Sequence, residues 1–395
     1  MKRSAILLPN PLRAAAHSGI TITRYYAMHF LAATFPFAAG VVLYGWRAAA
    51  AVGTVLLAAA GAVVIWRRVG TLGRQLRLPH ALWLATLLAL MLPAHLATLT
   101  ADEDGTILWP ILVAGGVVLV MLLWMLGGLG AGRVHPVLVT YLFLSVLFSA
   151  DLVPQSVLQR DKLVLGDVLY TPQSQSLVAH PEPWARRPLV DRYDATSAPS
   201  AAHRLIAYTR GRMVAERGLL RLQGLISDQL PPLEDLVVGG QPGPIGTSSA
   251  VAVIVGGLFL LYRGLIDYRI PLIIVITAYV LLLVLPIPAR FVEDWPQWRV
   301  FVMREPDVDW ATAYTFVHYE LMASPLLFTA LFLATAPSIR PLTRRARTVY
   351  ALLVGVLVAP AQLYVSVSVG PYLALFAASL LTPLLDRWMP PKPLV

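Results

Sequence analysis

Residues 249–271 read SAVAVIVGGLFLLYRGLIDYRIP: an apolar run reaches Tyr262, a short basic loop follows, and a second apolar run begins after Arg269. An α-helix needs about 20 mostly apolar residues to cross the hydrocarbon core of a bilayer. Applied outward from this stretch, that length predicts ten membrane spans, at residues 27–45, 48–66, 80–98, 107–127, 134–152, 249–265, 270–288, 320–338, 348–367 and 370–386. The sequence therefore predicts an all-α polytopic membrane protein of about ten transmembrane helices.

The composition agrees with a membrane protein and excludes several other classes. Hydrophobic residues make up 57% of the 395 residues and charged residues only 13%, and the mean hydropathy is +0.69, which is far more apolar than a soluble domain. The net charge of +10 does not predict nucleic-acid binding, because the bases collect in short loops beside the spans. The chain has no cysteine, so a redox cofactor would be a flavin, a quinone or a His-ligated haem.

The distribution of arginine predicts the orientation in a bacterial plasma (inner) membrane. Four short loops on one side of the spans carry arginine, whereas the loop at residues 101–105 on the other side is acidic. Because basic loops stay in the cytoplasm, we expect both termini there. The expected organisation is a cytoplasmic N-terminal segment (1–26), a first five-helix half (27–152), an external periplasmic-side segment (153–247), a second five-helix half (248–388) and a cytoplasmic tail (389–395).

Each half would contain five helices, which is an odd number. Homologous halves would then lie in opposite orientations, as in the inverted repeats of many transporters, with the functional site at their interface. We therefore expect a 5+5 inverted repeat.

Five stretches resemble one redox family in the same order along the chain. They are residues 85–93 (ATLLALMLP), 127–136 (GGLGAGRVHP), 242–271, 331–337 (LFLATAP) and 381–387 (LTPLLDR). The family is the D subunit of Rnf complexes together with its relative, the B subunit of the sodium-translocating NADH:quinone reductase. The resemblance implies an electron-transfer subunit without catalytic residues of its own, which carries electrons through flavin in a complex with other membrane and flavoprotein subunits. It also implies ion translocation by that complex.

Members of this family carry FMN esterified to a threonine of the external loop. The nearest match is residues 191–198 (DRYDATSA), which implies attachment at Thr196, with Ser197 and Ser200 as lesser candidates. The match is imperfect, because Asp194 stands where the family has glycine, the Asp-to-Thr spacing is one residue short, and Pro-Leu is replaced. A solvated loop rich in Ser, Thr and Ala is the alternative interpretation of the same residues.

Two glycine-rich turns are further candidates for cofactor binding. Glycine permits close approach of the backbone, and its exposed N–H groups can meet an anion or the edge of a flavin ring. Tight interhelical turns would have the same composition. The resemblance implies a second, noncovalent flavin (riboflavin) near the cytoplasmic side, for which the first turn is the candidate. The residues concerned are Gly127, Gly128, Gly130 and His135 in the first turn and Gly243 and Gly246 in the second.

Acidic residues are absent from the interior of every predicted span. Glu320 and Asp151 fall at span ends, Ala336 stands where the family has aspartate, and Thr247 replaces an acidic residue. Because intramembrane carboxylates mark ion relays, we do not expect this chain to relay ions by buried carboxylates alone. The histidines near span ends are interpreted as interfacial residues rather than haem ligands, and no metal site is predicted.

The external segment contains a basic amphipathic pattern at about residues 201–227. Such a helix favours a membrane surface, and docking of an acidic redox partner is the alternative. A second external loop, residues 290–318, is expected to make subunit contacts.

Two other functions remain open from the sequence. A cofactor-free scaffold subunit of a redox complex would keep the fold without flavin. A small-solute channel or transporter would use the same fold with a lined pore. Bound flavin distinguishes the electron carrier from both.

Overall fold

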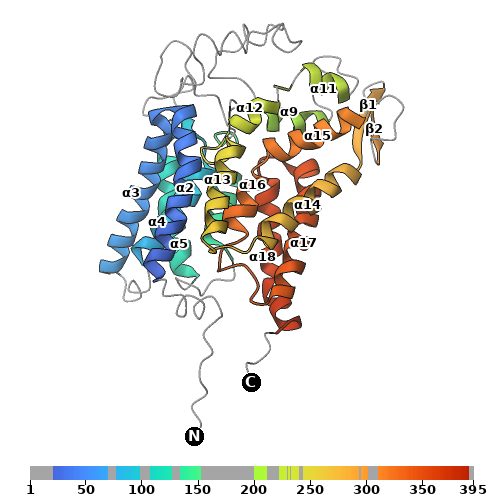
Figure 1. Cartoon of the computed structure of the whole chain (residues 1–395). Coiled ribbons are helices and arrows are strands. Elements are labelled where there is room, and N and C mark those ends of the chain that lie inside the picture. The colour runs from blue at the N-terminus through green and yellow to red at the C-terminus, as the bar shows by residue number, and fades with distance from the viewer. Residues whose placement is uncertain are drawn as a thin grey trace.

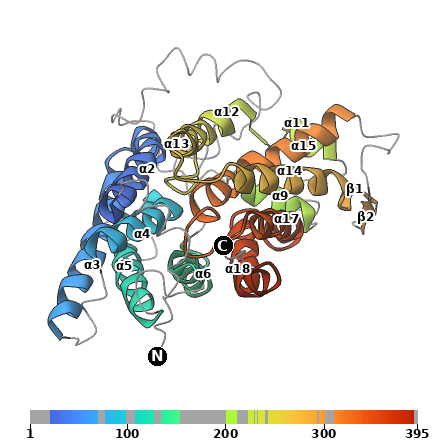
Figure 2. The same ribbon diagram turned by 60° about the horizontal axis from the view of Figure 1, so that its bottom comes forward.

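The computed structural model describes residues 21–69, 77–97, 107–126, 134–152, 200–210, 222–228, 230–231, 233–239, 243–292, 295–300 and 310–390. This part of the chain is helical apart from one two-stranded hairpin. The first group of helices forms one side of the molecule (Figures 1 and 2). It comprises α2 (Ile22–Tyr44), α3 (Trp46–Val69), α4 (Leu78–Met91) with the short 3₁₀ helix η2 (Ala94–Ala97), α5 (Trp109–Met125) and α6 (Pro136–Leu147).

The second group of long helices follows in the last third of the chain and forms the other side of the molecule (Figure 2). It comprises α13 (Ala250–Tyr262), α14 (Arg269–Val284), α15 (Trp310–Ala323) with α16 (Leu326–Phe328) and the π-helix η5 (Thr329–Leu333), α17 (Arg344–Pro360) with the π-helix η6 (Ala361–Val365), and α18 (Gly370–Trp388). Each predicted span overlaps one of these helices or helix pairs.

Length and hydropathy identify membrane spans among the described helices. Three are long and apolar enough to cross a bilayer, at Thr23–Tyr44, Trp46–Arg68 and Arg344–Val365, and the bent pair of α15 with α16 and η5 would be a fourth. Five shorter apolar helices accompany them: α4, α5, α6, α13 and α14. Large apolar side chains lie fully at the surface of these helices, as Val146 (79% exposed) and Leu57 (76%) do. Because such surfaces are stable in lipid and costly in water, the helices form a multi-pass membrane protein.

The eighth span differs from the sequence-based prediction. Its helix α15 begins at Trp310 rather than at residue 320, and the chain bends by 59° between Ala323 and Leu326. Pro325 lies at the bend, where its missing N–H interrupts the helical hydrogen bonds. As a result Glu320, predicted to lie at a span end, lies inside a helix and is fully buried.

The region predicted to form a second external loop contains regular structure. Strands β1 (Ile287–Val292) and β2 (Trp295–Arg299) pair antiparallel as a hairpin before α15 begins. The hairpin lies at the same end of the molecule as helices α9 (Ala201–Thr209), α11 (Leu222–Asp228) and α12 (Leu233–Val238), as Figure 1 shows.

The amphipathic pattern at residues 201–227 forms more than one element. Helix α9 (Ala201–Thr209) begins at the N-cap Ser200 and ends at Arg210, and α11 (Leu222–Asp228) and α12 (Leu233–Val238) follow; residues 211–221 lie outside the described part. The apolar side chains of α9, including Leu205 and Tyr208, are buried in a cluster with Phe316 and Leu363. The apolar face of α9 therefore covers the protein, and the membrane-surface interpretation is wrong for this helix.

Candidate functional site

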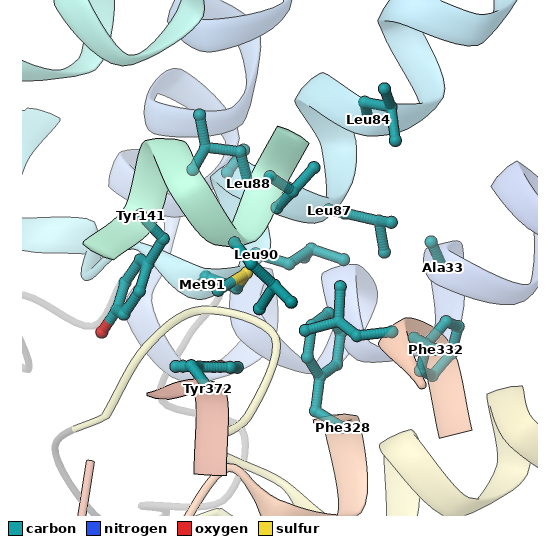
Figure 3. Packing of buried hydrophobic residues seen from close by; sticks show 14 of the residues in the cluster. Ala33, Leu84, Leu87, Leu88, Leu90, Met91, Tyr141, Phe328, Phe332 and Tyr372 are labelled. Atoms are coloured by element: carbon teal, nitrogen blue, oxygen red, sulfur yellow. The ribbon is translucent and has the colours of Figure 1, made fainter. Parts of the chain in front are cut away.

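The two groups of helices meet through equivalent members. The first helix of one group contacts the first of the other, because Gly256 of α13 lies against the carbonyl of Ala32 in α2. The fifth helices meet where the ring of Tyr141 on α6 packs edge-on against that of Tyr372 on α18, with 4.8 Å between ring centroids. Figure 3 shows this contact beside the buried side chains that fill the space between the groups, among them Leu90, Met91, Phe328 and Phe332.

A break in α4 is joined to the segment before α13 by backbone hydrogen bonds. Helix α4 ends at Met91, and Leu92 is extended before Pro93. Pro93 and Pro244 form an isolated antiparallel bridge, and the N–H groups of Ile245 and Gly246 donate to the carbonyls of Leu92 and Leu90. Backbone groups left free by the end of α4 are thereby satisfied inside the protein, as the membrane interior requires.

The glycines of this segment have different surroundings. A Cβ at Gly246 would lie 2.5 Å from Cβ of Leu90, whereas a Cβ at Gly243 would meet nothing closer than 3.6 Å. Gly246 is therefore required for close approach to α4, and this contact provides a structural reason for the glycine. The N–H of Gly246 already bonds Leu90, so this residue does not offer its backbone to a cofactor.

Aromatic and histidine side chains gather where α2, α4 and α6 begin. The Tyr25 and His29 rings have centroids 4.2 Å apart, Tyr26 and His80 are 5.1 Å apart, and His29 packs edge-on against Trp83 at 5.3 Å. His135 precedes α6, is 1% exposed, and lies close enough to His80 for the two imidazoles to interact electrostatically. We refer to Tyr25, Tyr26, His29, His80, Trp83 and His135 as the aromatic–histidine cluster.

Two polar atoms of the aromatic–histidine cluster are buried without a hydrogen-bond partner among the described residues. They are the hydroxyl oxygen of Tyr25 and Nδ1 of His135. Arg340, in the loop after η5, acts electrostatically on both Tyr25 and His29. Buried polar atoms without partners cost about 1–3 kcal/mol each, so two in one cluster indicate a place where a polar ligand would complete the hydrogen bonding.

The composition of the cluster fits a flavin ring. Aromatic side chains offer faces for stacking, Tyr25 and His135 offer hydrogen-bonding atoms for the polar edge, and Arg340 adds positive charge beside them. Of this group, the sequence alone pointed only to His135. The signal for the others is the repeated pairing of aromatic residues with histidine in the first turns of α2 and α4.

Several predicted site residues lie outside the described part of the chain: Thr196, Ser197, Gly127, Gly128 and Gly130. Of the candidates for flavin attachment the structure places only Ser200. Its hydroxyl accepts the N–H of His203 as the N-cap of α9, and the residue is 4% exposed. A buried hydroxyl that already caps a helix is poorly placed to form an ester with FMN, which argues against Ser200.

The family of the chain follows from a comparison of its whole length. A family model described as NQR2, RnfD, RnfE family matches residues 12–394. The chain belongs to this family. It is 28% identical over 156 residues to the D subunit of the ion-translocating oxidoreductase complex of Halorhodospira halophila, a stretch that covers 40% of this chain and 38% of that protein.

Two further relatives carry related names. Over 161 residues the chain is 27% identical to the D subunit of the Na(+)-translocating ferredoxin:NAD(+) oxidoreductase complex of Acetobacterium woodii, with 40% of this chain and 42% of that protein covered. Over 180 residues it is 24% identical to the D subunit of the proton-translocating ferredoxin:NAD(+) oxidoreductase complex of Clostridium ljungdahlii, with 44% and 48% covered. The chain thus spans less than half the length of these curated relatives of the NQR2, RnfD, RnfE family.

Proposed function

We propose that this member of the NQR2, RnfD, RnfE family is the membrane subunit of an Rnf-like electron-transport complex and carries electrons through bound flavin. The observation that supports flavin most directly is the pair of buried, unpartnered atoms on Tyr25 and His135 inside an aromatic cluster of the described residues. The complexes of its relatives are named as ion-translocating oxidoreductases. Its partners are accordingly the other membrane and flavoprotein subunits of such a complex.

In this proposal the aromatic–histidine cluster holds a noncovalent flavin at the cytoplasmic ends of α2, α4 and α6. A bound flavin supplies one- and two-electron chemistry. Tyr25 and His135 would bind its polar edge, and the positive charge of Arg340 would stabilise negative charge there. His29 and Trp83, which pack together, would exclude water from the ring.

A second flavin, FMN esterified to Thr196 in the external segment, belongs to the same proposal. It rests on the family and on residues 191–198. Fluorescence of the purified chain on a denaturing gel tests it, because an ester-linked flavin stays with the denatured protein. A fluorescent band that Thr196→Ala abolishes and Ser197→Ala leaves unchanged supports the site; a dark band with unmodified intact mass contradicts it.

We further propose that the two groups of helices are an inverted repeat with both termini in the cytoplasm. Three correspondences support this plan. The third member of each group is broken, at Leu92–Pro93 and between Ala323 and Leu326. The fourth helix of each group approaches the second through a glycine, with Gly116 of α5 against the Val55 carbonyl and Gly355 of α17 against the Ile274 carbonyl. The first and fifth helices of each group meet their counterparts.

The scaffold and channel functions make different predictions. A scaffold would purify within a complex without flavin on this chain. A channel needs a lined pore between the groups, where the structure instead places large buried side chains such as Leu90, Phe328 and Tyr372 (Figure 3). Flavin extracted from the purified chain therefore separates the proposed function from both.

A further inference from the structure

A buried carboxyl group lies beside the bend of the eighth span. Glu320 is on α15, one turn before the bend, and is 0% exposed. Its partner is Gln362, which is also 0% exposed and lies in the π-helix η6, 42 residues further along the chain. π-Helical turns are rare and occur most often at functional sites, and a second one, η5, follows directly after the bend.

The two side chains share hydrogen bonds, but each also has an oxygen atom without a hydrogen-bond donor among the described residues. Nε2 of Gln362 donates to the backbone carbonyl of Glu320 at 2.6 Å and to its Oε2 at 2.8 Å. Oε1 of Glu320 and Oε1 of Gln362 are both buried without a partner among the described residues. The pair therefore contains two acceptor oxygens and lacks one donor.

No cation neutralises Glu320 within the described part of the chain, where its carboxyl bonds Gln362 and forms no ion pair. Three nearby polar side chains are engaged elsewhere. Tyr319 donates to the carbonyl of Pro231, Arg210 to that of Val365, and Tyr364 to that of Pro286. Other ionisable side chains on the surrounding elements include His203, Arg204 and Tyr208 on α9, Glu234 on α12, Tyr279 on α14, Tyr314 and His318 on α15, Tyr350 on α17 and Tyr372 on α18.

We propose that Glu320 and Gln362 form a buried proton-binding site, in which the carboxyl group of Glu320 takes up and releases one proton. A proton on Oε1 supplies the one donor that the pair lacks, and the oxygen of Gln362 is an acceptor for it. A charged carboxylate buried without a cation is costly, whereas a neutral carboxyl group with hydrogen bonds is not. Buried carboxyl groups in membrane proteins mark proton pathways by the same reasoning.

The surrounding helices allow this proton to exchange. The bend between Ala323 and Leu326 and the π-helices η5 and η6 interrupt regular hydrogen bonding next to the pair. Such interruptions permit small rearrangements of a helix without unfolding it. The proton site thus adds an ion-binding function to the second half that is independent of the flavin sites.

Infrared difference spectroscopy of the full chain in lipid nanodiscs tests the site, and it needs no bound flavin. We expect a carboxylic-acid C=O band that shifts in D₂O and disappears as the pH is raised. Glu320→Gln should abolish the band. Asp386→Asn is the matched control, because Asp386 accepts the N–H of Leu342 at the far end of the bundle, and it should leave the band unchanged.

A second variant covers a loss of folding by Glu320→Gln. Gln362→Leu keeps the carboxyl group and removes its partner, so it should shift both the band frequency and the pH at which the band disappears. No exchangeable band in the wild-type chain, or a band that survives in Glu320→Gln, overturns the proposal. Loss of the band on adding Na⁺ at constant pH also overturns it, because the oxygens would then bind a metal cation.

Discussion

The backbone N–H of Gly246 donates to the carbonyl of Leu90 at 2.7 Å and so ties the start of the second group of helices to the broken end of α4. A side chain at position 246 would enter this contact. Gly246→Ala places a Cβ 2.5 Å from Cβ of Leu90, and overpacking of this kind costs about 1–3 kcal/mol. We expect a lower unfolding midpoint in detergent, measured by circular dichroism.

Gly243→Ala is the control for this substitution. The added Cβ would meet no atom closer than 3.6 Å, so its midpoint should match that of the wild type. Equal destabilisation by both variants would show that the close contact with Leu90 is not the cause.

The aromatic–histidine cluster predicts a change in noncovalent flavin content. His135→Ala and Tyr25→Phe each remove one of the two buried atoms that have no hydrogen-bond partner among the described residues. We expect several-fold less flavin per chain in the acid extract of either variant, measured by fluorescence. His318→Ala changes a partly exposed histidine on α15, outside the aromatic–histidine cluster, and should retain the wild-type amount. Equal flavin in all variants would place the ligand elsewhere.

Replacing Arg347 should destabilise the fold more than replacing the neighbouring Arg345. Its guanidinium bonds Asp267 at 3.3 Å and the carbonyls of Pro341 and Leu342 at 3.0 and 3.2 Å. Because charge-assisted hydrogen bonds to partly buried groups are lost together, Arg347→Ala should cost about 1–3 kcal/mol in the free energy of unfolding. Arg345, which is exposed, should change it by less than about 0.5 kcal/mol when replaced by alanine.

We expect α9 to detach from β1 at high pH because of Tyr208. Burial raises the pKa of the Tyr208 hydroxyl, which donates to the carbonyl of Pro288 in β1. The folded state therefore holds this proton more strongly, so its contribution to stability is complete below the usual phenol pKa of about 10 and is lost as the pH rises above it. Limited proteolysis around α9 should increase at high pH in the wild type, and Tyr208→Phe should flatten that dependence.

The absence of native cysteine makes the proposed orientation testable with single cysteines. Arg345→Cys lies at the basic start of α17 and Trp298→Cys lies on the hairpin, where Trp298 is 44% exposed. An impermeant maleimide added to intact cells with a permeable outer membrane should label position 298 and not 345. The reverse pattern would invert the topology.

Hydropathy predicts the helices well because lipid-facing and core-facing positions are both apolar in a membrane. The helices that carry Leu57 and Val146 are examples, since neither helix has a polar face. Because all these positions are apolar, hydropathy does not show where a span is bent or broken. Span length alone puts Glu320 at a span end, although Pro325 a few residues later indicates the true break.

The rest of each candidate site is formed by contacts between residues far apart in the sequence, which the sequence does not predict. Gln362 is 42 residues from Glu320, and no local pattern connects them. The aromatic–histidine cluster likewise joins the beginnings of three helices, and Arg340 reaches it from a distant loop in the second half of the chain. Amphipathic spacing in α9 correctly indicates one apolar face, but it does not distinguish a face against lipid from a face against α15.

The bond between Leu90 and Gly246 also bears on how the protein is made. Translation delivers α4 to the membrane long before the segment that precedes α13, so the carbonyls of Leu90 and Leu92 emerge without the donors that later satisfy them. Unsatisfied backbone groups are costly in lipid. The carbonyls at the end of α4 therefore stay without hydrogen-bond donors until Ile245 and Gly246 have been synthesised. A chaperone or insertase that covers this end of α4 in the meantime would increase the yield of the folded protein.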